Sequence, residues 1–250
     1  MDTYYWNEYS PALGRHMELK RYGHAGRPFL FIPCQNGHFY DFENFHMNDV
    51  FYPWIESGKC MVFAVDTIDE ETWSNTGADP EWRIQRHEAW MSFLVNEIAP
   101  FIRDQANQLN GWTGWPGIIS FGCSLGATHA ANLFFRYPKV FDGMLALSGI
   151  YTASYGFGDY MSETVYRNSA VDFLAGMPSD HPYIQEYNRG KGIMVVGQGP
   201  WEVPDTTLRI RDICQEKNIG IWVDVWGHDV AHDWDWWYQQ VDYHLPHLLG

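Results

Sequence analysis

The sequence is poor in basic residues and contains no long apolar run. Lys and Arg number 16 against 31 Asp and Glu, which gives a net charge of −15. A field of this sign repels phosphate backbones and anionic lipid headgroups, so neither nucleic-acid binding nor membrane docking is expected. No stretch approaches the roughly 18 consecutive apolar residues that cross a bilayer. The N-terminus also lacks the basic start and apolar core of a secretory signal, so we expect no export.

Cysteine is scarce and has no motif spacing. Cys34, Cys60, Cys123 and Cys214 lie far apart, with no C-x-x-C pair among them. This excludes a disulfide framework and a thiolate metal site as first interpretations, and it fits free thiols in a reducing compartment. We therefore predict a cytoplasmic protein.

Apolar and aromatic residues are abundant. The 250 residues are 46% hydrophobic and include 13 Trp, 15 Tyr and 15 Phe, which excludes a disordered chain. The length suits one well-packed α/β domain better than two, and no linker or repeat divides it. We expect a single domain over residues 1–250.

Short apolar runs alternate along the chain with segments of helical period. Residues 29–32 and 193–196 are continuously apolar, as strands covered on both faces must be, and Asp79-Pro80 provides a helix start. The alternation predicts the α/β class, with a mostly parallel central sheet flanked by helices on both faces. Residues 151–190 lack this alternation of apolar runs and helical segments, and they are predicted to form an excursion over the active site. The expected strands are 16–22, 28–34, 60–66, 117–120, 144–148, 193–197 and 219–225, and the expected helices are 79–98, 124–136, 206–217 and 233–249.

A Gly-x-Ser-x-Gly motif joins an expected strand to an expected helix at Gly122-Cys-Ser124-Leu-Gly126. This spacing is typical of a nucleophilic serine on a sharp turn, where side chains at the two glycines would collide with the neighbouring strand and helix. The turn also directs the Leu125 amide toward the place where an oxyanion would form. The alternative is a helix-capping serine with glycines for close packing, but it does not explain a glycine on both sides.

A serine nucleophile needs a base after the last strand, and two histidines are candidates. We favour His232, which opens the last helix, and assign His228 to the pocket. The same segment spells H-D-x-x-H, which resembles the zinc motif H-E-x-x-H. Because Gly227 and a strand precede His228, it lies outside a regular helix, and we predict no metal site.

The acid of a catalytic triad should follow the penultimate strand, where Glu202 and Asp205 both lie. Asp205 is a candidate N-cap for the next helix, whereas Glu202 has no such role, so Glu202 is preferred. The second oxyanion donor should come from the loop after residues 28–34. Gln35 is the first choice there and Asn36 the second.

These motifs resemble the esterase D-like branch of the α/β-hydrolases, which includes S-formylglutathione hydrolases and feruloyl esterases. The resemblance implies an α/β-hydrolase fold, Ser124 as nucleophile, an acid in the Glu202 loop, and His232 rather than His228 as base. The loop after residue 33 departs from the His-Gly-Gly of many esterases, and the Glu202 loop lacks the common Gly-x-x-Asp. The matching segments cover most of the chain after residue 28: Asn96-Glu-Ile-Ala-Pro-Phe-Ile, Gly122-Cys-Ser-Leu-Gly-Ala, Arg136-Tyr-Pro-Lys-Val-Phe-Asp-Gly, Leu147-Ser-Gly, Tyr166-Arg-Asn-Ser-Ala and His232-Asp-Trp-Asp-Trp-Trp.

The predicted function is hydrolysis of a carboxylic ester or thioester by a serine hydrolase without a cofactor. Transfer of the acyl group to an alcohol, hydrolysis by a metal at His228 and His232, and a non-catalytic binding role are the alternatives. The acidic charge favours neutral or cationic small-molecule esters. The sequence leaves the oligomeric state open. Aromatic residues near the proposed site predict a pocket for an apolar or aromatic group, with walls formed by Phe39, Tyr40, Trp73, Trp201 and Trp234.

Overall fold

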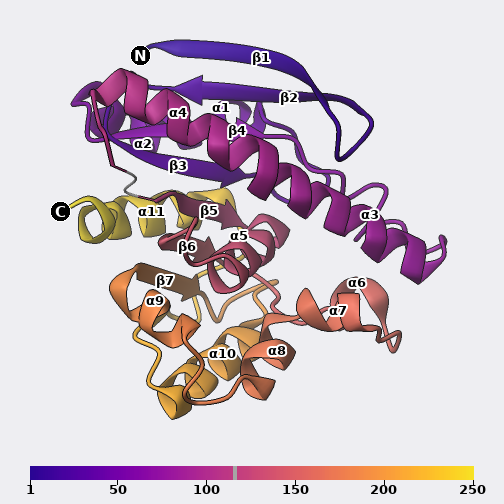
Figure 1. Cartoon of the computed structure of the whole chain (residues 1–250). Helices are drawn as coiled ribbons and strands as arrows, with labels where there is room; N and C mark the ends of the chain where they lie inside the picture. The colour runs from indigo at the N-terminus through magenta and orange to yellow at the C-terminus, as the bar shows by residue number, and fades with distance from the viewer. Residues whose placement is uncertain (115–116) are drawn as a thin grey trace.

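The computed structural model describes residues 1–114 and 117–250 and arranges them around one eight-stranded sheet (Figure 1). The strand order is β1-β2-β4-β3-β5-β6-β7-β8. β1 pairs with β2 and β2 with β4 in antiparallel fashion, and every later pairing is parallel. The predicted α/β class is therefore confirmed. The strands are β1 (Thr3–Ser10), β2 (Arg15–Tyr22), β3 (Arg27–Ile32), β4 (Cys60–Val65), β5 (Ile119–Cys123), β6 (Gly143–Leu147), β7 (Lys191–Val196) and β8 (Trp222–Val225).

Strand β1 is the element at the sheet edge that the sequence analysis missed. Most of its residues are exposed, whereas Trp6 is half-buried and Ser10 is buried. The strand therefore lacks the alternation of buried and exposed positions that predicts a half-buried strand. At the opposite edge, β8 begins at Trp222, three residues later than predicted.

Helices cover both faces of the sheet, in agreement with the prediction. None of the helices in the described ranges is long and apolar enough to cross a bilayer. The helices α1 and α2 were not predicted. The helical elements are α1 (Asp41–Asn44), α2 (Met47–Glu56), α3 (Pro80–Phe93), the π-helical turn η1 (Leu94–Ile98), α4 (Ala99–Asn110), α5 (Leu125–Arg136), α6 (Ser154–Phe157), α7 (Glu163–Arg167), α8 (Ala170–Gly176), α9 (Tyr183–Arg189), α10 (Pro204–Lys217) and α11 (Trp234–Leu249).

Side chains of alternate strand residues divide the core into two layers. Leu30 and Phe63 face α3, η1, α4 and part of α5, while Phe29, Phe31 and Phe121 face α2 and α11 on the other side. Farther along the first face, α5, α8, α9 and α10 pack on β6 and β7. Because the central strands are buried on both faces, their sequences are continuously apolar.

The helix predicted to end at Ile98 continues instead to Asn110 and ends at Gly111, which has φ 66°. Pro100 lies at the start of α4 and has no amide hydrogen for the carbonyl four residues earlier. The π-helical turn just before it accommodates this missing bond without ending the helix.

Residues 151–190 form short helices, and most of them do not cover the site. α8 and α9 pack into the core beside α5 and α10. Only the first part, around α6, contacts the predicted oxyanion loop, where the Tyr155 hydroxyl donates to Gln35 Oε1 at 3.0 Å. Apolar residues spaced along the later helices are buried, so α8 and α9 belong to the packed body of the domain.

Candidate active site

Ser124 lies on the turn between β5 and α5. Its backbone has φ 57° and ψ −129°, and its amide donates to the Leu147 carbonyl at 2.9 Å. A side chain at Gly122 would overlap the backbone of Gly126, and a side chain at Gly126 would overlap the carbonyl of Ile32. The two glycines of the motif are thus required by close backbone approach, as predicted.

The structure brings Ser124, His232 and Glu202 together. Ser124 Oγ lies 2.9 Å from His232 Nε2, and His232 Nδ1 lies 3.6 Å from Glu202 Oε2. The second distance is longer than a hydrogen bond. Both of these atoms are buried, and neither has a hydrogen-bond partner among the described residues. The imidazole therefore lies between the serine hydroxyl and the carboxylate.

Glu202 is held by two residues that the sequence analysis did not identify. Its side chain is 1% exposed, and its Oε1 accepts a hydrogen bond of 2.6 Å from the Ser148 hydroxyl. Ser148 Oγ in turn accepts from Trp237 Nε1 at 3.0 Å. The Trp237 ring meets the His232 ring edge to face, with centroids 5.0 Å apart. Ser148 follows β6 directly, and a polar residue at that end of a central parallel strand was the available signal.

Backbone contacts hold the loop that carries Glu202 and the loop that carries His232 against each other. The His232 amide donates to the Pro200 carbonyl at 3.0 Å, and the Gly199 amide donates to the Val230 carbonyl at 2.9 Å. A side chain at Gly199 would meet backbone atoms of both His228 and Val230. The loops after β7 and β8 therefore form one unit that carries Glu202 and His232.

The alternative acid and base lie apart from this arrangement. Asp205 is exposed in the first turn of α10, and Val203 rather than Asp205 is the N-cap, because Pro204 occupies the first helical position. The predicted capping role of Asp205 is therefore wrong. His228 is exposed on a turn, so His228 and His232 do not share a helical face. No cluster of three or more potential metal ligands occurs within residues 1–114 and 117–250.

The backbone amides of Leu125 and Gln35, the predicted oxyanion donors, have no hydrogen-bond partner in the described parts of the chain. The Asn36 amide, the second choice, donates instead to Asp69 Oδ2 at 3.3 Å. Of the two candidates in this loop, Gln35 is thus the one whose amide is free.

Cysteine side chains flank both halves of the site. Cys34 precedes Gln35 and Cys123 precedes Ser124. Burial raises the pKa of Cys34 to about 12 and raises the pKa of Cys123 well above its usual value. Both therefore remain neutral thiols and do not compete with Ser124 as nucleophiles.

Of the five aromatic residues predicted to line the pocket, one is buried in the core and four are exposed or half-buried. Trp73 is 1% exposed and packs in the core beside Phe157, so its assignment to the pocket wall is wrong. Trp201 is 88% exposed, next to Glu202. Trp234 stacks on Phe45 with centroids 4.6 Å apart. Phe39 is half-buried and Tyr40 is exposed in the loop after Gln35.

Comparison with known proteins places this chain in a family. Residues 10–248 match the model of the family described as "Esterase: Putative esterase". A search of curated protein sequences gives no match. Among solved structures, a ferulic acid esterase aligns with 15% identity and a TM-score of 0.74, covering 99% of this chain and 98% of that chain.

Two further structures show the same fold. An S-formylglutathione hydrolase from Agrobacterium tumefaciens has 14% identity and a TM-score of 0.73, with 99% of this chain and 95% of that chain covered. The fluorophosphonate-binding serine hydrolase FphF from Staphylococcus aureus has 12% identity and a TM-score of 0.69, with 100% and 98% covered. The fold is therefore the α/β-hydrolase fold.

Proposed function

Because the chain belongs to this esterase family and is a carboxylic ester hydrolase, we propose that it works through an acyl-enzyme formed on Ser124. The Ser124 hydroxyl attacks the carbonyl carbon of the ester while its proton passes to His232 Nε2. The carbonyl oxygen becomes an oxyanion that the Leu125 and Gln35 amides stabilise. When the tetrahedral intermediate collapses, the leaving alcohol takes the proton from His232. Water then repeats the sequence and releases the acid.

The contact between Ser124 Oγ and His232 Nε2 at 2.9 Å carries this proposal. A base must lie within hydrogen-bond reach of the proton that it takes, and this distance meets that requirement. Glu202 would keep the imidazole oriented and stabilise its protonated form, without accepting the proton. The 3.6 Å gap between Glu202 and His232 is expected to shorten when the imidazole becomes charged.

The substrate we propose is a small neutral ester or thioester with an apolar or aromatic group. The exposed Trp201 ring and the Trp234–Phe45 stack support an aromatic contact. Similar structures include a ferulic acid esterase and an S-formylglutathione hydrolase, so feruloyl esters and thioesters are the first substrates to test. The cytoplasmic location remains a prediction.

Labelling by a fluorophosphonate tests the nucleophile and the base together. Wild type should label and hydrolyse p-nitrophenyl butyrate, and Ser124→Ala should do neither. His232→Ala should lower kcat by at least about 10³-fold, whereas His228→Ala should stay within threefold of wild type. A wild type that does not label would contradict the serine mechanism, and a greater loss for His228→Ala would show that His228 is the base.

The acid is tested by Glu202→Gln beside Asp205→Asn. The first should lower kcat by about 10²-fold or more because it removes the charge facing His232. The second should leave kcat unchanged, since Asp205 is exposed on α10. Activity should also survive a metal chelator, because no step in this mechanism uses a metal.

A further inference from the structure

A buried carboxylate and a buried histidine lie beneath the loop that carries Gln35. Asp69 belongs to the loop after β4 and His129 to α5, and their side chains are 2% and 0% exposed. His129 Nε2 donates to Asp69 Oδ1 at 3.0 Å. The His129 ring is enclosed by Trp73, His87 and Trp90, with centroids 5.7, 5.1 and 5.0 Å away. The pair therefore has little freedom to move, and the mechanism proposed above does not use it.

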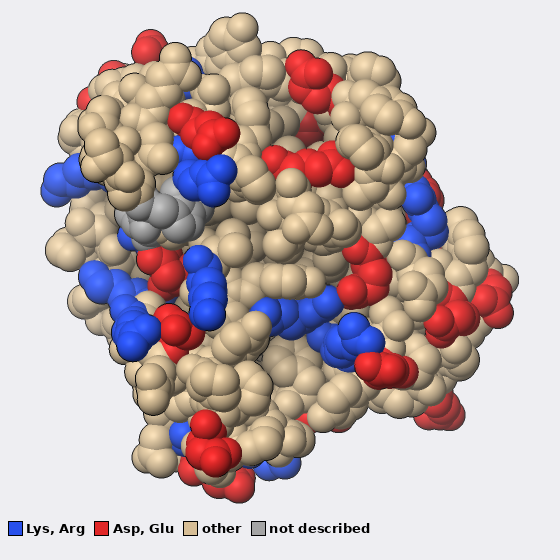
Figure 2. All heavy atoms as spheres, in the orientation of Figure 1, with Lys and Arg blue, Asp and Glu red and all other residues tan. Residues whose placement is uncertain are grey.

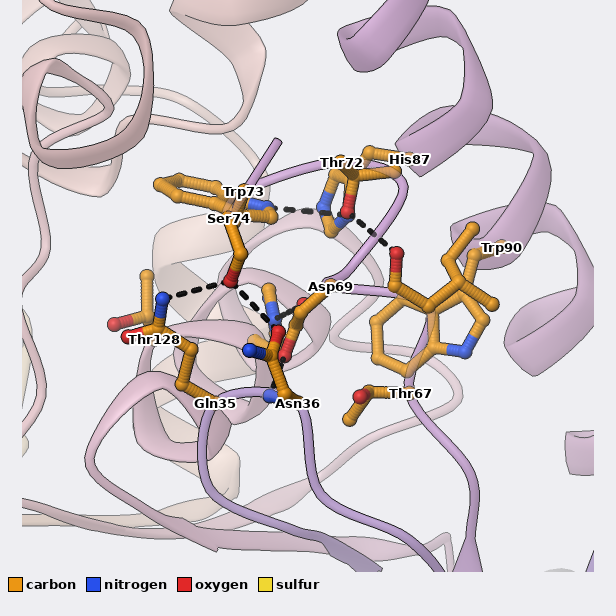
Figure 3. A network of polar contacts seen from close by, with 12 residues as sticks. Gln35, Asn36, Thr67, Asp69, Thr72, Trp73, Ser74, His87, Trp90 and Thr128 are labelled. Carbon is orange, nitrogen blue, oxygen red and sulfur yellow. Dashed lines mark hydrogen bonds and ion pairs between the residues drawn. The ribbon is translucent and has the colours of Figure 1, made fainter. Parts of the chain in front are cut away.

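The other oxygen of Asp69 reaches the Gln35 loop (Figure 3). Asp69 Oδ2 accepts from the Asn36 amide at 3.3 Å. The same loop after β4 supplies Ser74, whose amide donates to the Asp69 carbonyl at 2.8 Å. Ser74 Oγ accepts from Gln35 Nε2 at 2.7 Å and donates to Asn36 Oδ1 at 2.7 Å. Both residues of the Gln35–Asn36 pair are thus tied to one neighbouring loop.

The Gln35–Asn36 segment needs such support because little else fixes its conformation. Asn36 has φ 60°, and both side chains are exposed. Asparagine tolerates the left-handed region better than most residues, but contacts with its surroundings must still select it over extended or right-handed backbone. Asn36 lies inside the turn in which the Gly37 amide donates to the Cys34 carbonyl at 2.8 Å, and that carbonyl shares a peptide plane with the Gln35 N–H. Removing the Asp69 contact would loosen this turn and so change the direction of the Gln35 N–H.

We propose that Asp69, held in place by His129, is a positioning residue that fixes the Gln35 loop so that the Gln35 amide points at the oxyanion. This inference rests on the proposed function, because it concerns the oxyanion site of that reaction. Asp69 does not touch the substrate. The negative charge of Asp69 beneath the Gln35 loop would oppose the negative charge that develops on the oxyanion. The hydrogen bond from His129 to Asp69 Oδ1 reduces that effect, because it partly neutralises the carboxylate.

The test compares Asp69→Ala with wild type at a temperature where both are folded. For p-nitrophenyl butyrate, kcat should fall by about 10- to 100-fold while KM stays within threefold, because the loss affects the transition state. Affinity for an alkyl trifluoromethyl ketone, which forms an oxyanion adduct with the serine, should fall by a similar factor. Hydrogen exchange of residues 34–40 should become faster. Asp69→Asn, which keeps an acceptor for the Asn36 amide, should recover most of the lost kcat.

Thr72→Val is the matched control. Thr72 is buried in the same loop, but its hydroxyl donates only to the Ile68 carbonyl at 3.1 Å. It should lower stability and leave kcat and ketone affinity unchanged. If Asp69→Ala keeps wild-type kcat, or if Thr72→Val loses as much kcat, the positioning role is wrong. Failure of wild type to hydrolyse or label would instead contradict the proposed function, and hydrogen exchange would still test the Asp69 contact.

Discussion

At the scale of single residues, the site depends on backbone conformations that side chains rarely adopt. Six non-glycine residues with positive φ occur in the described ranges, and Asn36, Ser124, Ser148 and Trp201 of these lie in loops at the site. Such a conformation costs roughly 1–3 kcal/mol, less for an asparagine such as Asn36, and it persists because the surrounding contacts offset that cost. The concentration of these residues around Ser124 indicates that the surrounding contacts serve geometry as well as stability.

Ser148→Ala tests the contact that holds Glu202, the proposed acid. Removing the hydroxyl leaves Glu202 Oε1 without its 2.6 Å donor, so the carboxylate should face His232 less accurately. We expect kcat for p-nitrophenyl butyrate to fall by about 10-fold with KM unchanged. Steady-state kinetics check this.

Ser120→Ala is the matched control for Ser148→Ala. Ser120 is also buried, but its hydroxyl donates to the carbonyls of Ala130 and Gly143. The change should cost about 1 kcal/mol of stability and leave kcat intact. Equal losses of kcat in both variants would indicate a general loosening of the core and contradict the specific role of Ser148.

At the scale of elements, the site depends on how closely α5 approaches β3. The first turn of α5 lies against the end of β3, where a side chain at Gly126 would overlap the carbonyls of Ile32 and Pro33. The small residues Ala127, Ala130 and Ala131 are buried on the same helix. This close packing brings the Ser124 turn beside the loop that begins after β3.

Gly126→Ala should separate these two elements. Because the overlapping atoms belong to the backbone, the helix itself must shift, and we expect a loss of several kcal/mol of stability together with most of the activity. Gly77→Ala is the control, since no atom lies within 4 Å of a side chain there. The free energy of unfolding in urea and the turnover number should be measured for both variants. Near-wild-type values for Gly126→Ala would contradict the close packing of α5 on β3.

At the scale of the whole molecule, the net charge of −15 acts on any charged substrate. Figure 2 shows that on the face drawn there Lys and Arg lie among Asp and Glu, so local charges of both signs occur within a negative total. At low ionic strength the net field should still attract cations, because the Debye length grows from about 10 Å at 0.1 M salt to about 30 Å at 0.01 M and charges within that distance are only weakly screened.

Raising the salt concentration should therefore affect three p-nitrophenyl esters differently. The value of kcat/KM should fall for a cationic ester, by as much as about 10-fold, and should rise for an anionic one. A neutral ester of similar size is the control and should change little. An identical response from all three would mean that the net charge does not influence substrate encounter.

The pH dependence of stability should reflect His87, which is fully buried under the Gln35 loop region. Burial, followed by the nearby His129, lowers the pKa of His87 well below 6.5. The folded protein therefore keeps His87 neutral while the unfolded chain takes up a proton. Its contribution to stability is complete above about pH 6.5 and is lost as the pH falls below that value.

Between pH 7.5 and 5.5 this linkage should cost about 1.4 kcal/mol. Urea unfolding at both pH values should show that loss in wild type and a smaller one in His87→Gln. His16→Gln, at an exposed position, should behave as wild type. A wild-type slope in His87→Gln would mean that other groups cause the acid sensitivity. His244, whose pKa burial also lowers, is the first of these.

Local signals were enough to predict the class of the sheet, most of its strands and the sharp turn that carries Ser124. Short continuous apolar runs such as 29–32, repeated between helical segments, are typical of strands buried on both faces, and Gly-x-Ser-x-Gly requires two glycines for reasons of local geometry. Strand β1 and the short helices α1 and α2 escaped prediction because exposed or brief elements carry little periodicity.

The sequence by itself determined that this chain forms an α/β fold with a serine on a sharp turn, because backbone geometry and the alternation of apolar runs are local properties. Only the tertiary structure decided which partners surround that serine. His232, Glu202 and Ser148 come from three separate loops, and their distances depend on the order of the strands and on how the loops pack. The same holds for Trp73, whose burial depends on residues far along the chain.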